Sequence, residues 1–497
     1  MLAVGRYRGR GSQREPPPSI SQIVPTAVRQ LRLSDVINLP IFYRFRSTKA
    51  LLGEFHELER QEIYFSPPEQ LNDPIEGFKD LFWQGDEIVW RNLLRHYLMC
   101  LMWGYTLVKI GGDYREALSQ DTPVLSRLLL PIPQGREILN DICERFFGRY
   151  SIDEVPALLA KCQVRFRRDA LEFVLRSLHP VAFNSVLHVY RQRGMETSPD
   201  IAPPNGQAAP ENVVAAMKEV LVKIAAGDDD ATPEQLGVMF SVASTITKQV
   251  ELLAYLDSPS DISRAWLSIV VSFPEAYIDR LQHFVFFKWY AACFVADPND
   301  AAMWSHYGDS HRGVCLQIRA ADDRDGPTIK LRSVVSSSGI DEASVPVRRE
   351  IPLTFQPMNY VDSLAPIDFF RSLARVPIPD LKADWYLDAD GSCSECAEGV
   401  LSQSREWLDS NWAAFVASTT TKLRYWEHER EYRLVLPSIL DLYDTIDARR
   451  LQFDFADLEG IVFGIKTPLA QKEEIIKIVL AKCERDGRKE FKFSQAL

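Results

Sequence analysis

Strand-like segments lie near both ends of this chain, and a long helical stretch separates them. The N-terminal strand signals, at residues 41–45 and 63–65, have too few strand neighbours nearby to form a sheet. Because an isolated strand leaves its backbone N–H and C=O groups unpaired, we expect these strands to join those after residue 285. The sequence therefore predicts an α+β fold, in which a mixed β-sheet built from the N- and C-terminal parts carries a large all-helical insertion.

The predicted domain boundaries follow changes in the local pattern. Residues 1–30 are rich in Gly, Arg and Pro, which is typical of a flexible tail. Residues 31–85 supply the N-terminal part of the α/β core, and residues 286–497 supply its C-terminal part. Between them, residues 86–285 show helical periodicity broken by segments rich in Pro and Asp. We interpret this stretch as the helical insertion.

The composition restricts the class of protein. The net charge of −11 disfavours nucleic acid and anionic membranes as partners of the whole surface. The longest apolar run, residues 97–108, is too short for the roughly 20 residues that cross a bilayer, so it predicts a buried helix. Eight scattered cysteines favour a reduced cytoplasmic location. A zinc site at Cys393 and Cys396 would need a second close pair, which the chain lacks, and no metal is favoured.

The segment "AAMWSHYGDSHRGVCLQIR", residues 301–319, concentrates polar and titrating side chains before a strand. The sequence predicts a short helix that begins near Asn299 or Asp300 and ends at Gly308. One interpretation is a structural turn; the other is the wall of a site, where Tyr307 stacks on a base or nicotinamide and His306 bonds to a ribose. We expect a turn that also lines a cleft.

The segment "RYWEHEREYRLVL", residues 424–436, holds the candidate acidic residues. As a strand it would place Glu427, Glu429 and Glu431 on one face, whereas as a helix it would place Glu427 and Glu431 one turn apart. These carboxylates are either a solvated edge with internal ion pairs or a pair, Glu429 and Glu431, that opens onto a cleft.

Two arginines on the first strand complement these acids. Arg44 and Arg46 share one face of the predicted strand, while Tyr43 lies on the other. They either pair with Glu429 and Glu431 or hold a phosphate, which the guanidinium fork binds well. Further along, Ser66 ends the next strand, and with Glu69 it resembles a capping box.

Three segments together resemble the bacterial family catalogued as domain of unknown function 2971. They are "YRFR" with "IYFSPPEQLNDP", then Cys293-Phe294 with "MWSHYGDSHRGVCLQI", then Lys422 with "WEHEREYRL" and "LEGIVFGIK". The resemblance covers about residues 40 to 80 and 285 to 470. Relatives resemble abortive-infection proteins, which implies a role in phage defence but supplies no chemistry.

The order Arg, Ser, Glu-x-Glu also resembles that of ADP-ribosyltransferase-type folds. That resemblance implies that Arg44 or Arg46 holds an NAD phosphate, that Ser66 supports the nicotinamide side, and that Glu431 stabilises a ribose oxocarbenium ion. The predicted catalytic residues are therefore Glu431, Glu429 and His306. The predicted nucleotide-binding residues are Tyr43, Arg44, Arg46, Ser66 and Tyr307.

Three functions stay open at this point. The leading hypothesis is a cytoplasmic bacterial effector that uses NAD or another nucleotide, by ADP-ribosyl transfer or NAD cleavage. The second is a metal-dependent hydrolase or nuclease built from His306, Asp309, His311 and Glu429. The third is a sensor or interaction protein whose helical insertion binds a protein partner.

Overall fold

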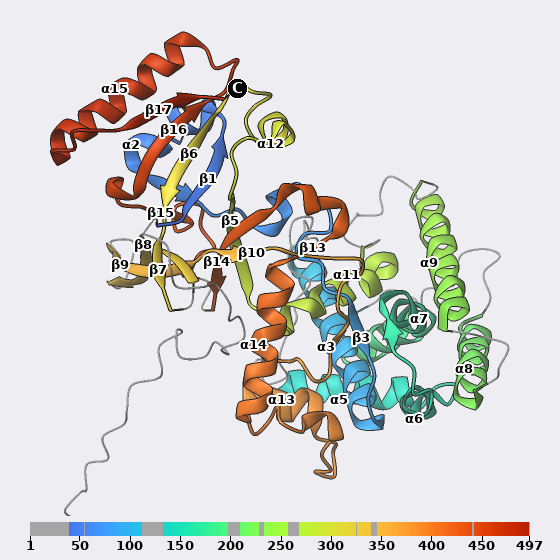
Figure 1. Ribbon diagram of the computed structural model, residues 1–497. Helices are drawn as coiled ribbons and strands as arrows, with labels where there is room; N and C mark the ends of the chain where they lie inside the picture. Colours follow the sequence, from blue (N-terminus) through green and yellow to red (C-terminus); the bar gives the residue numbers. More distant parts are fainter. Residues whose placement is uncertain are drawn as a thin grey trace, which may run out of the picture.

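The chain has an α+β fold in the computed structural model (Figure 1). The structure describes residues 39–496, apart from 54, 112–132, 197–208, 228–232, 257–267, 325, 339–344 and 440–441. The predicted N-terminal tail, residues 1–30, lies outside the described residues.

One sheet joins the two ends of the chain, as the sequence predicts. The first strand pairs antiparallel with strands from beyond the helical insertion on both of its sides, so it lies inside the sheet. Among the named strands of this sheet, β16 and β17 pair in parallel, whereas the other neighbours pair antiparallel. The sheet is therefore mixed. The order is β10 (Gln356–Pro357), β14 (Glu431–Ser438), β5 (Lys288–Val295), β1 (Ile41–Arg46), β6 (Val314–Arg319), β16 (Leu458–Phe463) and β17 (Lys492–Gln495).

A second sheet packs on one face of the first. Buried apolar residues from both sheets and from helix α15 form one hydrophobic core, which includes Phe42, Phe294 and Leu451. The second sheet contains β2 (Glu62–Tyr64), β15 (Arg450–Gln452), β8 (Gly326–Ser338), β7 (Ala321–Asp323) and β9 (Val345–Thr354). Three short helices, α1 (Thr48–Leu52), α2 (Glu57–Arg60) and α12 (Ala301–His306), and the longer α15 (Leu469–Asp486) flank the sheets.

Residues 86–285 are mainly helical where they are described. The exception is the two-residue strand β4 (Phe166–Arg167), which pairs with β3 (Leu81–Trp83), itself paired with β12 (Ile367–Asp368). The helices are α3 (Glu87–Gly111), α5 (Pro133–Phe147), α6 (Val155–Lys161), α7 (Arg168–Gln192), α8 (Pro210–Ala226), α9 (Pro233–Leu256) and α11 (Phe273–Leu281). In Figure 1 they form a body beside the sheets.

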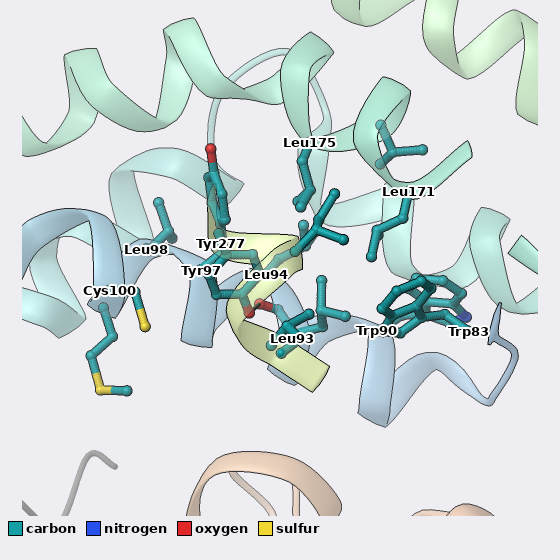
Figure 2. Close-up of a cluster of buried hydrophobic side chains, with 14 of the residues drawn as sticks. Trp83, Trp90, Leu93, Leu94, Tyr97, Leu98, Cys100, Leu171, Leu175 and Tyr277 are labelled. Atoms are coloured by element: carbon teal, nitrogen blue, oxygen red, sulfur yellow. Dashed lines mark hydrogen bonds between the residues drawn. The ribbon is translucent and has the colours of Figure 1, made fainter. Parts of the chain in front are cut away.

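The apolar run at residues 97–108 lies in α3, which is the centre of this body. Trp90, Leu94 and Tyr97 of α3 are almost fully buried against Leu171 and Leu175 of α7 (Figure 2). The apolar run is therefore part of a protein core. Burial of these large side chains stabilises the packing of α3 against α7.

A later segment of the chain completes the helical body. Residues 367–419 include α13 (Ile378–Leu381) and α14 (Arg405–Thr419), which Figure 1 draws in the helical half of the molecule. Phe369, Phe370, Trp385 and Phe415 belong to the same hydrophobic core as α3 and α7. The chain therefore returns to the helical body before it enters the strands that carry the acidic residues.

Candidate functional site

The sheet holds a cavity of about 260 Å³, here called the central cavity. Strands β1, β5 and β14, the segment after β2, helix α12 and residues 422–429 form its walls. Seven of the eight predicted site residues line it: Tyr43, Arg44, Arg46, Ser66, Tyr307, Glu429 and Glu431.

The central cavity opens where two neighbours of β5 part. β5 pairs with β1 at Tyr43↔Val295 and with the segment after β2 at Ser66↔Ala291. Between these points, residues 292–294 of β5 pair with neither of these two neighbours. Since N–H and C=O groups alternate between the two edges of an antiparallel strand, those of Cys293 point toward the opening. The cavity wall therefore offers a backbone donor and a backbone acceptor.

The strand register brings the acidic residues to this opening. Val295 of β5 lies opposite Tyr43 of β1 on one side and opposite Glu431 of β14 on the other. Directly paired residues have their side chains on the same face of a sheet, so Tyr43 and Glu431 share a face. Arg44 alternates to the other face of β1 and also lines the cavity.

Lys422 holds the two carboxylates together. It lies in β13 (Thr421–Leu423), and its Nζ is 2.7 Å from an Oε2 atom of Glu429 and 2.7 Å from the Oε2 of Glu431. All three side chains are buried, with 3% to 4% of their surface exposed. The two carboxylates would repel each other at this depth, and the ammonium between them offsets that repulsion.

Arg433 fixes Glu431 from the other side. The Arg433 Nε donates to Glu431 Oε1 at 2.7 Å, while its terminal nitrogens donate to both carboxylate oxygens of Glu76 at 2.6 and 2.7 Å. Burial raises the pKa of Glu431, but the charges of Arg433 and Lys422 oppose it and lower that pKa to about 2. Glu431 is therefore an anion held in one orientation.

The backbone before β14 explains why both acids face Lys422. Residues Arg424–Glu429 form a 3₁₀ helix, and Arg430 has a left-handed conformation with φ 44°. Residues 424–430 form neither the predicted β-strand nor the predicted α-helix. The turn at Arg430 redirects the chain before β14 begins. Consequently Glu427 is exposed, whereas Glu429 and Glu431 point inward. The predicted solvated edge is wrong for these two acids.

The two arginines of β1 differ in their partners, and neither pairs with Glu429 or Glu431. Arg46 binds Glu57 of α2 through two hydrogen bonds, one of them from Nε at 2.8 Å. Arg44 is 6% exposed and donates from Nη2 to the carbonyl of Tyr64 at 2.9 Å. Within the described ranges, its buried Nη1 has no hydrogen-bond partner. Burial, together with the charge of Arg46, lowers the pKa of Arg44 to about 10. It remains a buried cation at neutral pH.

Tyr307 joins this network, whereas Ser66 lines the cavity from the sheet. The Tyr307 hydroxyl donates to Oε1 of Glu429, which also accepts from Asn72. Ser66 exchanges two backbone hydrogen bonds with Ala291, at 2.8 and 2.9 Å. The predicted capping box is wrong, because the short helix after Ser66 has Pro67 at its N-cap and no side-chain cap. Ser66 is held by the sheet instead.

His306 does not line the central cavity. It ends α12, whose N-cap is Asp300 as the sequence predicts, and its side chain is exposed. Residues 309–311 all have φ between 50° and 68°. This tight turn then reaches Gly313, where a Cβ atom would lie 2.4 Å from the carbonyl oxygen of Arg46. The segment is a structural turn, and Met303 and Tyr307 are its residues that line this cavity.

Sequence reasoning missed three residues of the site: Lys422, Arg433 and Cys293. Lys422 lies in β13 and Glu429 ends the following 3₁₀ helix, so no single helical or strand periodicity spans the two residues. Arg433 was visible as the next residue on the Glu431 face of a strand. The role of Cys293 depends on strand pairing and has no signal in its side chain.

Two further sequence predictions concern a metal site and membrane-spanning helices. Among the described residues, no group of three or more His, Cys, Asp or Glu side chains is arranged to hold a metal ion. The set His306, Asp309, His311 and Glu429 is therefore not assembled as a metal centre. None of the described helices combines the length and apolarity needed to cross a bilayer.

Comparisons with family models, with curated proteins and with solved structures found no significant match to this chain.

Proposed function

We propose that the central cavity binds the nicotinamide end of NAD and that the protein cleaves NAD or transfers its ADP-ribosyl group. The observation that carries this proposal is the convergence of Arg44, Ser66, Tyr307 and Glu431 on one cavity. The order of Arg44, Ser66 and Glu431 in the chain resembles the Arg, Ser, Glu-x-Glu order of ADP-ribosyltransferase-type folds. The resemblance to family 2971 adds a role in bacterial phage defence, in the cytoplasm, to the proposal.

The groups around the cavity suit two parts of this substrate. The Nη1 of Arg44, which has no partner among the described residues, is a donor for a phosphate oxygen, and a buried guanidinium binds phosphate strongly. The N–H and C=O of Cys293 complement the C=O and NH₂ of a primary amide, such as that of nicotinamide. A volume of about 260 Å³ is below the roughly 300–1,000 Å³ of sites that enclose a whole ligand. The adenosine half would therefore lie outside.

Glu431 is the residue to which we assign catalysis. When the bond between nicotinamide and ribose breaks, nicotinamide leaves with the bonding electrons and positive charge develops on the ribose. A carboxylate already fixed in place lowers the energy of that charge without reorganising. Lys422 and Arg433 occupy part of the hydrogen-bonding capacity of Glu431, and a carboxylate has about four acceptor positions. Glu429, joined to Tyr307, forms the adjoining wall.

The test is nicotinamide release by purified wild type and by Glu431→Gln, together with calorimetry of NAD binding. The substitution keeps the shape and removes the charge. We expect release to fall by roughly 100-fold or more, the range seen when one transition-state electrostatic contact is lost. The matched control is Glu427→Gln, because Glu427 is exposed and four residues away; it should release nicotinamide like wild type. A wild-type protein that does not bind NAD overturns the proposal.

A second candidate function rests on helix α9. Val238, Val242, Ile246 and Leu253 are each more than half exposed and follow helical spacing along it. An exposed apolar stripe of this kind favours a protein-binding role for the helical insertion. The first partner to test is a second copy of the chain: sedimentation of wild type and of Val242→Glu/Ile246→Glu should show association only in wild type. A monomeric wild type removes that partner.

A further inference from the structure

A second cavity, of about 370 Å³, lies beside the central cavity, and we call it the α14 cavity. Its walls are residues 73–80, residues 359–367, helix α14 and strand β13. Lys422 lines both cavities, so the α14 cavity adjoins the position of Glu429 and Glu431. Nothing in the proposed NAD chemistry uses this space.

Small residues on α14 create the hollow. Ala414, Ala417 and Ser418 line it and are three and four residues apart, so they lie on one face of the helix. The facing wall is apolar and includes Val361, Leu364, Pro366, Ile367 and Leu423. A ligand with an apolar body therefore matches most of the surface.

The charged residues around the α14 cavity are engaged elsewhere, with one exception. Glu76 binds Arg433, and Asp80 binds Arg167. The Asp73 carboxylate accepts the N–H of Ile75 at 3.0 Å, and Lys422 binds the two catalytic-side acids. The exception is Lys79, which lines the cavity and has no ion-pair or hydrogen-bond partner for its ammonium among the described residues.

The surroundings of Lys79 favour an anion from outside the chain. Burial and the nearby charge of Arg375 together lower the pKa of Lys79 to about 8, and Glu69 only partly opposes them. The Lys79 side chain is half-buried, and partial desolvation of an ammonium without a counter-ion is unfavourable. A bound anionic group would supply the missing partner.

We propose that the α14 cavity is a binding site for a small carboxylic acid with an apolar body, whose carboxylate pairs with Lys79. This goes beyond the proposed function, since it requires neither NAD nor its cleavage. The volume is at the lower end of the roughly 300–1,000 Å³ of small-molecule sites, so a compact acid is expected. An acid with a straight acyl chain and an acid with a fused aromatic ring both combine an apolar body with a carboxylate.

The experiment is calorimetry on the full chain below pH 7, with octanoate and 2-naphthoate as the two probes and 2-naphthalenemethanol as the neutral analogue. We expect wild type to bind at least one carboxylate at one site, and the stronger probe identifies the body shape. Lys79→Met should weaken that binding by roughly tenfold or more, because a charged hydrogen bond is lost. It should leave the binding of the neutral analogue unchanged.

Two further variants locate the site. Ala417→Phe fills the hollow and should abolish binding of carboxylate and alcohol alike. Arg44→Met removes the cation of the central cavity and should leave carboxylate binding at the wild-type value. Wild type that binds neither carboxylate overturns the proposal, and so does Lys79→Met that binds them as tightly as wild type. Loss of binding in Arg44→Met would place the acid in the central cavity and also overturns it.

Discussion

Arg44 and Arg46 are two residues apart on β1, and Arg46 is the one that pairs with a carboxylate among the residues described. Glu57 of α2 accepts hydrogen bonds from Arg46, while the buried Nη1 of Arg44 has no partner in the described part of the chain. The two guanidiniums therefore have different roles. Arg46 fastens β1 to α2, and Arg44 remains available to an anion in the central cavity.

Arg44→Lys should weaken the binding of ADP-ribose by roughly tenfold or more, because a single ammonium cannot replace the guanidinium fork. Arg46→Lys is the matched substitution on the same strand. It should change the affinity for ADP-ribose much less and should lower the urea midpoint, since the hydrogen bonds to the buried Glu57 are impaired. Isothermal titration and urea unfolding of both variants measure the two effects. Equal losses of affinity would contradict the division of roles.

Lys422 is the second test of the charge network. Lys422→Met leaves Glu429 and Glu431 buried without the ammonium between them. Breaking a buried ion pair by removing one partner costs about 3–5 kcal/mol of unfolding free energy. The control, Lys477→Met on the exposed side of α15, should change it by less than about 0.5 kcal/mol. Urea unfolding that gives similar values for the two variants would contradict the structural role of Lys422.

The lowered pKa of Glu431 predicts a pH dependence of stability. A carboxyl whose pKa is about 2 in the folded chain and 4.5 ordinarily contributes stability above pH 4.5, and this contribution is lost as the pH falls toward 2. The difference in urea midpoint between wild type and Glu431→Gln should therefore be constant from pH 7 to about 5. It should then shrink toward pH 3. A difference that grows on acidification would show that the pKa is raised.

The sequence predicted the parts of the fold that hydrophobic patterns determine. The alternating segments that became β1, β5 and β14 are adjacent in the sheet, and this adjacency brings Arg44, Ser66 and Glu431 to one cavity. The pattern could not determine the chain between Lys422 and Glu431. There the left-handed Arg430 turns the backbone, and tertiary ion pairs with Lys422 and Arg433 decide which acids point inward.

Two other features depended on contacts between distant parts of the chain. His306 shares a segment with Tyr307, yet the end of α12 turns its imidazole to solvent. Residues 369–415 pack on α3 because their aromatic side chains complete its core, which no local periodicity indicates. The ion pair between Glu76 and Arg433 likewise joins distant parts of the chain, so no local pattern predicts it.

The last prediction concerns the segment shared by the two cavities. Asn72 contacts Glu429 and Glu76 binds Arg433, while residues 73–80 line the α14 cavity. An acid bound beside this segment should displace these contacts, so ADP-ribose should bind more weakly when 2-naphthoate is saturating.

Coupling between two sites typically changes affinity by roughly 5–150-fold, and the effect is reciprocal. Titration of ADP-ribose with and without 2-naphthoate, and the reverse titration, should therefore give the same factor. Ala417→Phe is the control, because it should bind ADP-ribose with an affinity that 2-naphthoate does not change. If wild type binds both ligands with independent affinities, the shared segment does not connect the cavities, although each site still stands on its own measurement.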